Sequence, residues 1–356
     1  MKQLFARRIS GLGLFLGLTV ATALPAAAQL GGRAVFPFLE LAPGAKQAAL
    51  GGMNVSNRSD DPTTVAGNPA LLSADMTGHA ALTYIAYVAG IKQSTAAYAF
   101  HTPKAGQFAV GLTYLNYGDL ESFDAAGNSL GTFGVNEYAL SGTNSYTKGK
   151  FTFGLTGKLA LSSIAGNRST AGAVDAGVLY KHPKEDFTAG LAVKNLGFQF
   201  SPYPGADRGR LPLDVQLGAS AKPAHMPLRF TLTAHHLQQW NIQYLDPNAR
   251  GTLNGNNEEV RPKKSFGDNL ARHFTVAAAL LLSDNLQFRV GYNHLQRREL
   301  RLDNTSGGAG LSFGAMLKIS GFQLDYTHAT LQAAGSSDYF TLSKALFKPK
   351  EAAPVE

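Results

Sequence analysis

The chain has no cysteine among its 356 residues, and charged residues make up only 16% of it. Without cysteine it forms no disulfide scaffold, no zinc site with thiolate ligands and no thiol active site. A mean hydropathy of −0.08 argues against a bundle of membrane helices, each of which needs about twenty consecutive apolar residues. Beyond the N-terminus the sequence has no such run. What remains, with 39 glycines and 21 phenylalanines, suits many strands joined by turns.

The N-terminus has the pattern of a secretory signal peptide. Lys2, Arg7 and Arg8 precede an apolar stretch that ends in small residues, so residues 1–28 are predicted to be removed by cleavage after Ala28. Removal takes three of the 32 basic residues and none of the 24 acidic ones, which leaves a net charge of +5. This excess is small and dispersed, and it does not indicate a nucleic-acid partner.

An exported chain without membrane helices can still span a membrane as a closed β-barrel, whose strands need only about nine to eleven residues. Residues 151–162 show the alternation that such strands require. Phe151, Phe153 and Leu155 share one face, while Thr, Gly, Lys and Ser occupy the other. Mid-strand charges fall on the polar face throughout, and we predict that they face the lumen, where ion pairing with a plug is favoured over a conducting pore. They are Lys158, Asp175, Lys194, Asp214, Arg229, Arg289 and Asp325.

Counting such segments predicts about fourteen strands between residues 79 and 347, an even number that puts both ends of the barrel on one side. The predicted strands cover residues 79–88, 93–101, 107–117, 135–147, 150–162, 170–181, 186–196, 211–221, 227–237, 271–281, 286–296, 307–318, 321–331 and 338–347. Short turns alternate with longer connections at residues 118–134, 163–169, 197–210, 238–270 and 297–306, as expected for periplasmic turns and extracellular loops.

A secreted β-sandwich or β-helix is the soluble alternative, because it would also alternate. No linker-like break divides residues 79–347, and the apolar rows are richer in Phe, Leu and Val than a solvated sheet face. Both observations favour the barrel. Residues 348–356 follow the last predicted strand and are predicted to form a disordered periplasmic tail.

Residues 29–78 lack sustained alternation and are predicted to fill the lumen. They carry Gly51-Gly52, Asp60-Asp61-Pro62 and the tripeptide Asn68-Pro69-Ala70. This ordered set resembles the N-terminal plug of the FadL-like outer-membrane barrels, a family whose members have fourteen strands. Lys194-Asn195-Leu196-Gly197 and the run from Thr233 to Trp240 resemble the PorV/PorQ group of type IX secretion proteins within that family. The resemblance implies an all-β fold, a FadL-like transmembrane antiparallel barrel with an N-terminal plug.

It further implies an outer-membrane anchor rather than an enzyme. Members of this group act with a surface protein, PorZ, the sortase PorU and the barrel PorV to join secreted cargo to anionic lipopolysaccharide. We expect a PorZ-like partner to dock on the loops at residues 197–210 and 238–270 or on nearby basic residues, although solvated loop charge is the alternative explanation of the latter. The candidate docking residues are Phe198, Phe200, Tyr203, Trp240, Tyr244, Arg261, Lys263, Lys264, Arg297 and Arg298.

A FadL-type transporter of hydrophobic small molecules is the second hypothesis. It requires an apolar row in the lumen, and the predicted rows of Gly, Thr, Lys, Arg and Asp favour the anchor. The spacing Gly-x-Ser-x-Gly occurs at residues 127–131 and 310–314, in a predicted loop and a predicted strand, but neither copy has the strand–turn–helix context that a nucleophile elbow requires. His235 and His236 are the only adjacent histidines, and neighbours on a strand face opposite sides. We therefore predict no catalytic residues, no metal site and no cofactor.

Overall fold

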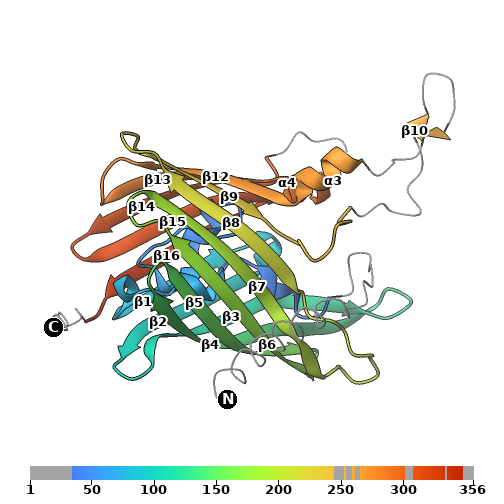
Figure 1. The fold of residues 1–356 in the computed structure, drawn as a ribbon. Helices are drawn as coiled ribbons and strands as arrows, with labels where there is room; N and C mark the ends of the chain where they lie inside the picture. Colours follow the sequence, from blue (N-terminus) through green and yellow to red (C-terminus); the bar gives the residue numbers. More distant parts are fainter. Residues whose placement is uncertain are drawn as a thin grey trace, which may run out of the picture.

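Fourteen antiparallel strands close into a barrel in the computed structural model, which describes residues 34–243, 252–253, 259–260, 265–300, 308–332 and 335–347 (Figure 1). β1 (His79–Ala86) pairs with β16 (Gly335–Ala345) to complete the ring, and His79 lies opposite Ala345. The first strand therefore begins, and the last strand ends, at the same end of the barrel. The predicted barrel of about fourteen antiparallel strands is confirmed.

The remaining strands follow one another around the ring, apart from a small separate hairpin of β10 (Thr252–Leu253) and β11 (Glu259–Val260). The other barrel strands are β2 (Lys92–Thr102), β3 (Gly106–Phe123), β4 (Ser129–Lys148), β5 (Phe151–Ile164), β6 (Asn167–Lys181), β7 (Asp186–Ser201), β8 (Asp214–Lys222), β9 (Leu228–Ala234), β12 (Phe274–Leu281), β13 (Leu286–Asn293), β14 (Leu311–Ile319) and β15 (Phe322–Gln332). None of the helices in the described part of the chain has the length and hydropathy that a membrane-spanning helix needs.

The two-residue period of the sequence becomes the inside and outside of the wall. On β5, Phe153 and Leu155 are about half exposed on the outer face, whereas Thr156 and Ser162 are buried on the inner face. The same division holds on β13, where Phe288 and Val290 face outward and Arg289 is buried. An outer surface of Phe, Leu and Val around a polar inner wall is the pattern of a barrel that crosses a membrane.

The two ends of the barrel differ. At the end where β1 begins, strands are joined by connections of two to five residues, and we call this the short-turn end. The opposite end carries the three longest connections, at residues 202–213, 235–273 and 294–310, and we call it the long-loop end. The three longest connections therefore lie at the end opposite the short turns, as predicted, although the other connections at the long-loop end have only two to five residues.

Several predicted boundaries at the long-loop end are wrong. The loop predicted at residues 118–134 is mostly strand, because a bulge after Asn116 absorbs Gly118 and pairing resumes with Asp119 opposite Gly134. β3 and β4 consequently reach 18 and 20 residues, whereas β9 and β12 have seven and eight. The connection predicted at 163–169 shrinks to two residues because β5 and β6 also continue pairing further than expected. The wall thus rises higher over β3–β7 than elsewhere.

Two short helices replace predicted strand ends on the side of the barrel where the strands are shorter. α3 (Phe266–Arg272) precedes β12, and α4 (His294–Glu299) follows β13; Figure 1 shows them close together at the long-loop end. α4 begins where it does because the Asn293 side chain accepts a hydrogen bond from the Gln296 N–H at 3.2 Å.

Residues 34–78, which we call the inner segment, run through the barrel as short helical turns. These are η1 (Pro37–Glu40), α2 (Ala45–Ala49), η2 (Pro62–Ala66), η3 (Pro69–Leu71) and η4 (Ala74–Met76); one further turn, η5 (Val88–Gly90), joins β1 to β2. Proline opens three of the turns, and Asp61 and Asn68 cap η2 and η3. α2 packs against β13–β16 and η3 against β4–β6, so the segment touches opposite sides of the inner wall.

Candidate functional site

The tripeptide Asn68-Pro69-Ala70 lies against a track of glycines on the inner wall. A Cβ atom built on Gly154 would overlap the Pro69 carbonyl carbon and the Ala70 amide nitrogen, and one built on Gly177 would overlap the Asn68 side chain. Across the strand pairs, Gly154 lies opposite Gly177. The track continues on the next two strands at Gly190 and Gly218, where a Cβ would press on Val55. At these four positions the inner segment approaches the wall too closely for a side chain on the strand.

Asn68 joins the inner segment to itself and to the wall. Its Oδ1 accepts a hydrogen bond from the Ala70 N–H at 2.9 Å, and its Nδ2 donates to the Val55 carbonyl at 2.8 Å. The same Nδ2 lies 3.5 Å from the Leu191 carbonyl of β7. Asn68 is fully buried, so all of these groups are away from water and must be paired.

The motif Lys194-Asn195-Leu196-Gly197 forms a β-bulge between β6 and β7. Pairing shifts between Val174 and Ala176, and Asn195 takes a left-handed conformation with φ of 58°. The Asp175 carboxylate, fully buried, accepts the Asn195 N–H at 2.7 Å and forms an ion pair with the Lys158 ammonium at 2.5 Å. The bulge thus carries a buried ion pair inside the wall.

We expect Asn195→Ala to lower the free energy of unfolding by about 2 kcal/mol, because alanine is strained at positive φ and removes two buried hydrogen bonds. The Asn195 side chain bonds to Lys158 Nζ and to the Pro212 carbonyl, both at 3.0 Å. Asn195→Gly keeps the backbone conformation and should cost less. Thermal unfolding in detergent, followed by the gel shift of the folded barrel, measures both variants; an Asn195→Ala variant as stable as the wild type would contradict the bulge argument.

The predicted lumen charges face inward and are mostly paired within the wall. Arg289 pairs with Asp325, whose other oxygen accepts from Gln323 Nε2 at 2.6 Å. Arg229 pairs with Asp186 at 2.5 Å. A connection from wall to inner segment is made by Lys318, whose ammonium lies 2.6 Å from Asp60. Sequence reasoning named neither Lys318 nor Asp186, since both lie at strand ends near the short turns.

At the long-loop end, α3 and α4 are tied together by Asp268. Its Oδ1 lies 2.8 Å from Arg298 Nε, and its Oδ2 accepts from Arg272 Nε at 2.9 Å and from Gln243 Nε2 at 2.8 Å. Arg298, predicted as a docking residue, is therefore engaged in this contact, and Arg297 lies beside it in α4. The carboxylate fixes both helices and the connection before α3 in one arrangement.

Trp240 lies beside these helices and exposes about half of its surface. Its ring stacks on His273 with centroids 5.6 Å apart, and the Phe266 ring packs against it at 5.3 Å. The Trp240 carbonyl accepts hydrogen bonds from Asn269 Nδ2 at 2.5 Å and from His273 at 3.0 Å. Phe266 is 70% exposed, which makes the Trp240–Phe266 pair a rigid apolar projection into solvent. Sequence reasoning missed Phe266, whose only signal was its aromatic character.

The other predicted docking residues do not share one position at the long-loop end. Phe198 and Phe200 lie on β7 rather than in a loop, because pairing with β6 continues to Ser201; both are exposed on the outer face in edge-to-face contact at 5.0 Å. Tyr203 turns back toward the barrel and donates to Ser162 Oγ at 2.7 Å. Tyr244, Arg261, Lys263 and Lys264 lie outside the described residues, as do the predicted signal peptide and tail.

His235 and His236 meet, contrary to the prediction from strand geometry. His236 lies past the end of β9 with φ of 55°, so the two Nδ1 atoms come within 2.7 Å instead of facing opposite sides. His236 also approaches Glu40 and Asp214, each at 3.9 Å. Within the described residues, no three His, Cys, Asp or Glu side chains are arranged to hold a metal ion.

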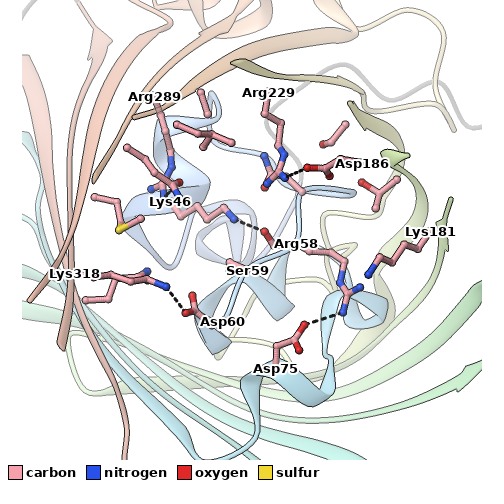
Figure 2. A pocket seen from close by; sticks show the side chains of 18 residues that line it. Lys46, Arg58, Ser59, Asp60, Asp75, Lys181, Asp186, Arg229, Arg289 and Lys318 are labelled. Carbon is pink, nitrogen blue, oxygen red and sulfur yellow. Dashed lines mark hydrogen bonds and ion pairs between the residues drawn. The ribbon is translucent and has the colours of Figure 1, made fainter. Parts of the chain in front are cut away.

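Two cavities adjoin the inner segment. The smaller, of about 190 Å³, lies toward the long-loop end, where Leu41 and Ala48 of the inner segment face Leu300, Leu311 and Tyr339. Its lining is largely apolar. The larger, of about 400 Å³, lies at the short-turn end and is lined mainly by charged and polar side chains (Figure 2).

Comparison with known proteins finds similar solved structures only. No family model and no curated protein sequence matches the chain. The toluene transporter TbuX of Ralstonia pickettii is 14% identical, with 87% of this chain and 99% of that chain covered and a TM-score of 0.49. The toluene transporter TodX of P. putida is 12% identical, covers 86% of this chain and 99% of its own, and also scores 0.49. A FadL homologue of Pseudomonas aeruginosa, 12% identical over 86% and 98%, scores 0.45.

Proposed function

We propose that the protein is an outer-membrane barrel that anchors a surface partner, in the manner of PorQ in the type IX attachment complex. The observation that carries this proposal is the Trp240–Phe266 pair, a rigid and exposed aromatic projection at the long-loop end. The partner would be a PorZ-like surface protein, which in turn would bring the PorU sortase, PorV and lipopolysaccharide into reach. The motif resemblance supplies the identity of this partner.

The outer surface supports a membrane location. Ten of the fourteen barrel strands have the nine or more residues that a tilted membrane strand needs, and the shorter strands β9 and β12, of seven and eight residues, are also apolar outside. Their outer faces carry Phe230, Leu232 and Val276, each nearly half exposed in the isolated chain. Such a surface requires lipid around it. On this orientation the short-turn end faces the periplasm and the long-loop end faces the outside.

The interior supports an anchor better than an open channel. The inner segment is buried along its length, with Leu50, Leu71 and Leu72 almost inaccessible. It is attached to the wall by the glycine track and by the Lys318–Asp60 pair. Because the inner segment occupies the lumen, the surfaces left for binding a partner are the loops and the outer wall.

The Trp240–Phe266 pair has the character of a binding hot spot. Aromatic side chains that are held in place before binding lose little conformational entropy when a partner covers them. The stack on His273 and the Asp268 contacts to α3 and α4 supply that rigidity. The higher wall of β3–β7 would flank the partner, with Phe198 and Phe200 on its outer side.

Affinity purification of the tagged protein from native outer membranes tests this proposal. We expect the wild type to retain a large surface protein in near-equal amount, and Trp240→Ala/Phe266→Ala to retain at least about tenfold less. Phe322→Ala, an exposed phenylalanine at the short-turn end, is the matched control and should retain the partner. A correctly folded double variant that keeps its partner would contradict the docking surface.

A FadL-type transporter is the second candidate, favoured by the apolar cavity of about 190 Å³ between the inner segment and β14. Apolar pockets with few polar groups are typical of sites for hydrophobic ligands. The same purification distinguishes the two functions. Recovery of the barrel alone with bound fatty acid or lipid would contradict the anchor and support transport.

A further inference from the structure

The polar cavity at the short-turn end has an excess of positive charge. Figure 2 shows side chains of the inner segment meeting side chains of the wall around it. Six cationic residues line the cavity against three carboxylates. The cations are Lys46, Arg58, Lys181, Arg229, Arg289 and Lys318, and the carboxylates are Asp60, Asp75 and Asp186.

Each of the three carboxylates of the lining forms an ion pair with one of its cations. Arg58 pairs with Asp75 at 3.2 Å, and the pairs Lys318–Asp60 and Arg229–Asp186 are described above. Arg289 is matched by Asp325 behind the lining. In the part of the chain that the structure describes, neither Lys46 nor Lys181 has an acidic side chain within ion-pair distance.

Lys46 is the more unusual of the two. It lies on α2, exposes 5% of its surface, and donates only to the Arg58 carbonyl, at 2.7 Å. The buried carboxylate of Asp61 is bonded to Thr63 and does not pair with it. Burial, together with the nearby positive charges of Arg289 and Arg229, lowers the pKa of Lys46 to about 7. A buried ammonium without a counter-ion is costly, and an anion in the cavity would remove that cost.

We propose that this cavity binds a phosphate group, free or as part of a phosphorylated molecule, that enters from the short-turn end. A multiply charged oxyanion offers several acceptor oxygens to lysine and arginine donors that converge from the inner segment and from several strands. The volume of about 400 Å³ leaves room for a second phosphate or a small organic group beside the first. This site is independent of partner docking at the opposite end.

Titration of the full chain with inorganic diphosphate, by calorimetry in an uncharged detergent at fixed ionic strength, tests the proposal. We expect saturable binding that chloride at the same ionic strength does not replace. Lys181→Gln, at an exposed position that does not endanger folding, should raise the dissociation constant about tenfold, and Lys46→Met should raise it at least as much. Lys150→Gln, an exposed lysine at the same end but outside the cavity lining, is the matched control and should bind like the wild type.

The source of the phosphate is decided by a second arm in lipid nanodiscs with and without phosphatidic acid. Weaker diphosphate binding in the presence of phosphatidic acid identifies a lipid headgroup as occupant, and unchanged binding identifies a soluble phosphate. Absence of diphosphate binding by the wild type would overturn the proposal. So would equal affinity in Lys181→Gln, Lys46→Met and Lys150→Gln, because binding would then not involve the two unpaired lysines.

Discussion

Gly154→Val is expected to release the inner segment from the wall and to destabilise the barrel by about 3 kcal/mol. The added side chain would overlap the main chain of Pro69 and Ala70, which no change of rotamer can relieve. η3 packs between β4, β5 and β6, so a shift there would also strain the Asn68 contacts to Val55 and Leu191. The expected loss of stability therefore includes the strained Asn68 contacts as well as the steric clash itself.

Gly157→Val is the matched control for this prediction. Gly157 lies three residues further along β5 on the outer face, and a Cβ built on it meets nothing within 4 Å. The same substitution there should change stability by no more than about 0.5 kcal/mol. Thermal unfolding in detergent measures the difference between the two variants.

Limited proteolysis adds a test of where the effect arises. In Gly154→Val we expect cleavage within residues 34–78 while the barrel strands stay protected, because the inner segment is held by contacts that the substitution removes. The wild type and Gly157→Val should resist under the same conditions. If Gly154→Val were as stable and as resistant as its control, the glycine track would not be what holds the inner segment.

The wall of the barrel was predictable because its physics is local. Each strand alternates lipid-facing and lumen-facing side chains, so the period of two is written directly into segments such as residues 151–162. Inward orientation of Asp175 and Asp325 follows from the same period and is confirmed. The closure of β1 on β16 adds no separate sequence signal, since an even count and short turns already require it.

The long-loop end was predicted less well because its structure depends on contacts between distant residues. α3 and α4 have seven and six residues, too few to show a helical period, and they are fixed by Asp268 and its arginine partners. Glycine is typical of turns, but Gly118 lies in a β-bulge and the strand continues beyond it. His236 reads as a strand residue, yet its positive φ turns it toward His235.

The candidate site shows the same contrast. Trp240 was found because the only tryptophan in a predicted loop is conspicuous, whereas Phe266 gained its role only when α3 placed it against Trp240. The excess of cations at the short-turn end could not be predicted from the sequence either. Lys46 and Lys181 are 135 positions apart in the sequence, and only barrel closure around the inner segment brings them to one cavity.

Arg289→Leu is expected to destabilise the barrel by about 3–5 kcal/mol, because it leaves the fully buried carboxylate of Asp325 without a counter-charge. Gln323 Nε2, at 2.6 Å from the other carboxylate oxygen, offers a neutral hydrogen bond but no charge. Asp325 is fully buried and does not line the polar cavity, so little water reaches its carboxylate. Asp325→Leu should be costly for the reciprocal reason.

The double variant Arg289→Leu/Asp325→Leu should recover much of this loss. With both charges gone, the cost of burying an unpaired ion disappears, and apolar side chains of similar volume replace the pair. A double-mutant cycle on unfolding free energies should therefore give a coupling of at least about 2 kcal/mol.

The Arg229–Asp186 pair provides the contrast within the same barrel. Its side chains are 23% and 48% exposed, so water screens the charges and Arg229→Leu should cost less than about 1 kcal/mol. Burial, rather than ion pairing as such, then explains why one pair governs stability and the other does not. Equal losses for Arg289→Leu and Arg229→Leu, or additive effects in the cycle, would show that Asp325 finds another counter-charge when Arg289 is removed.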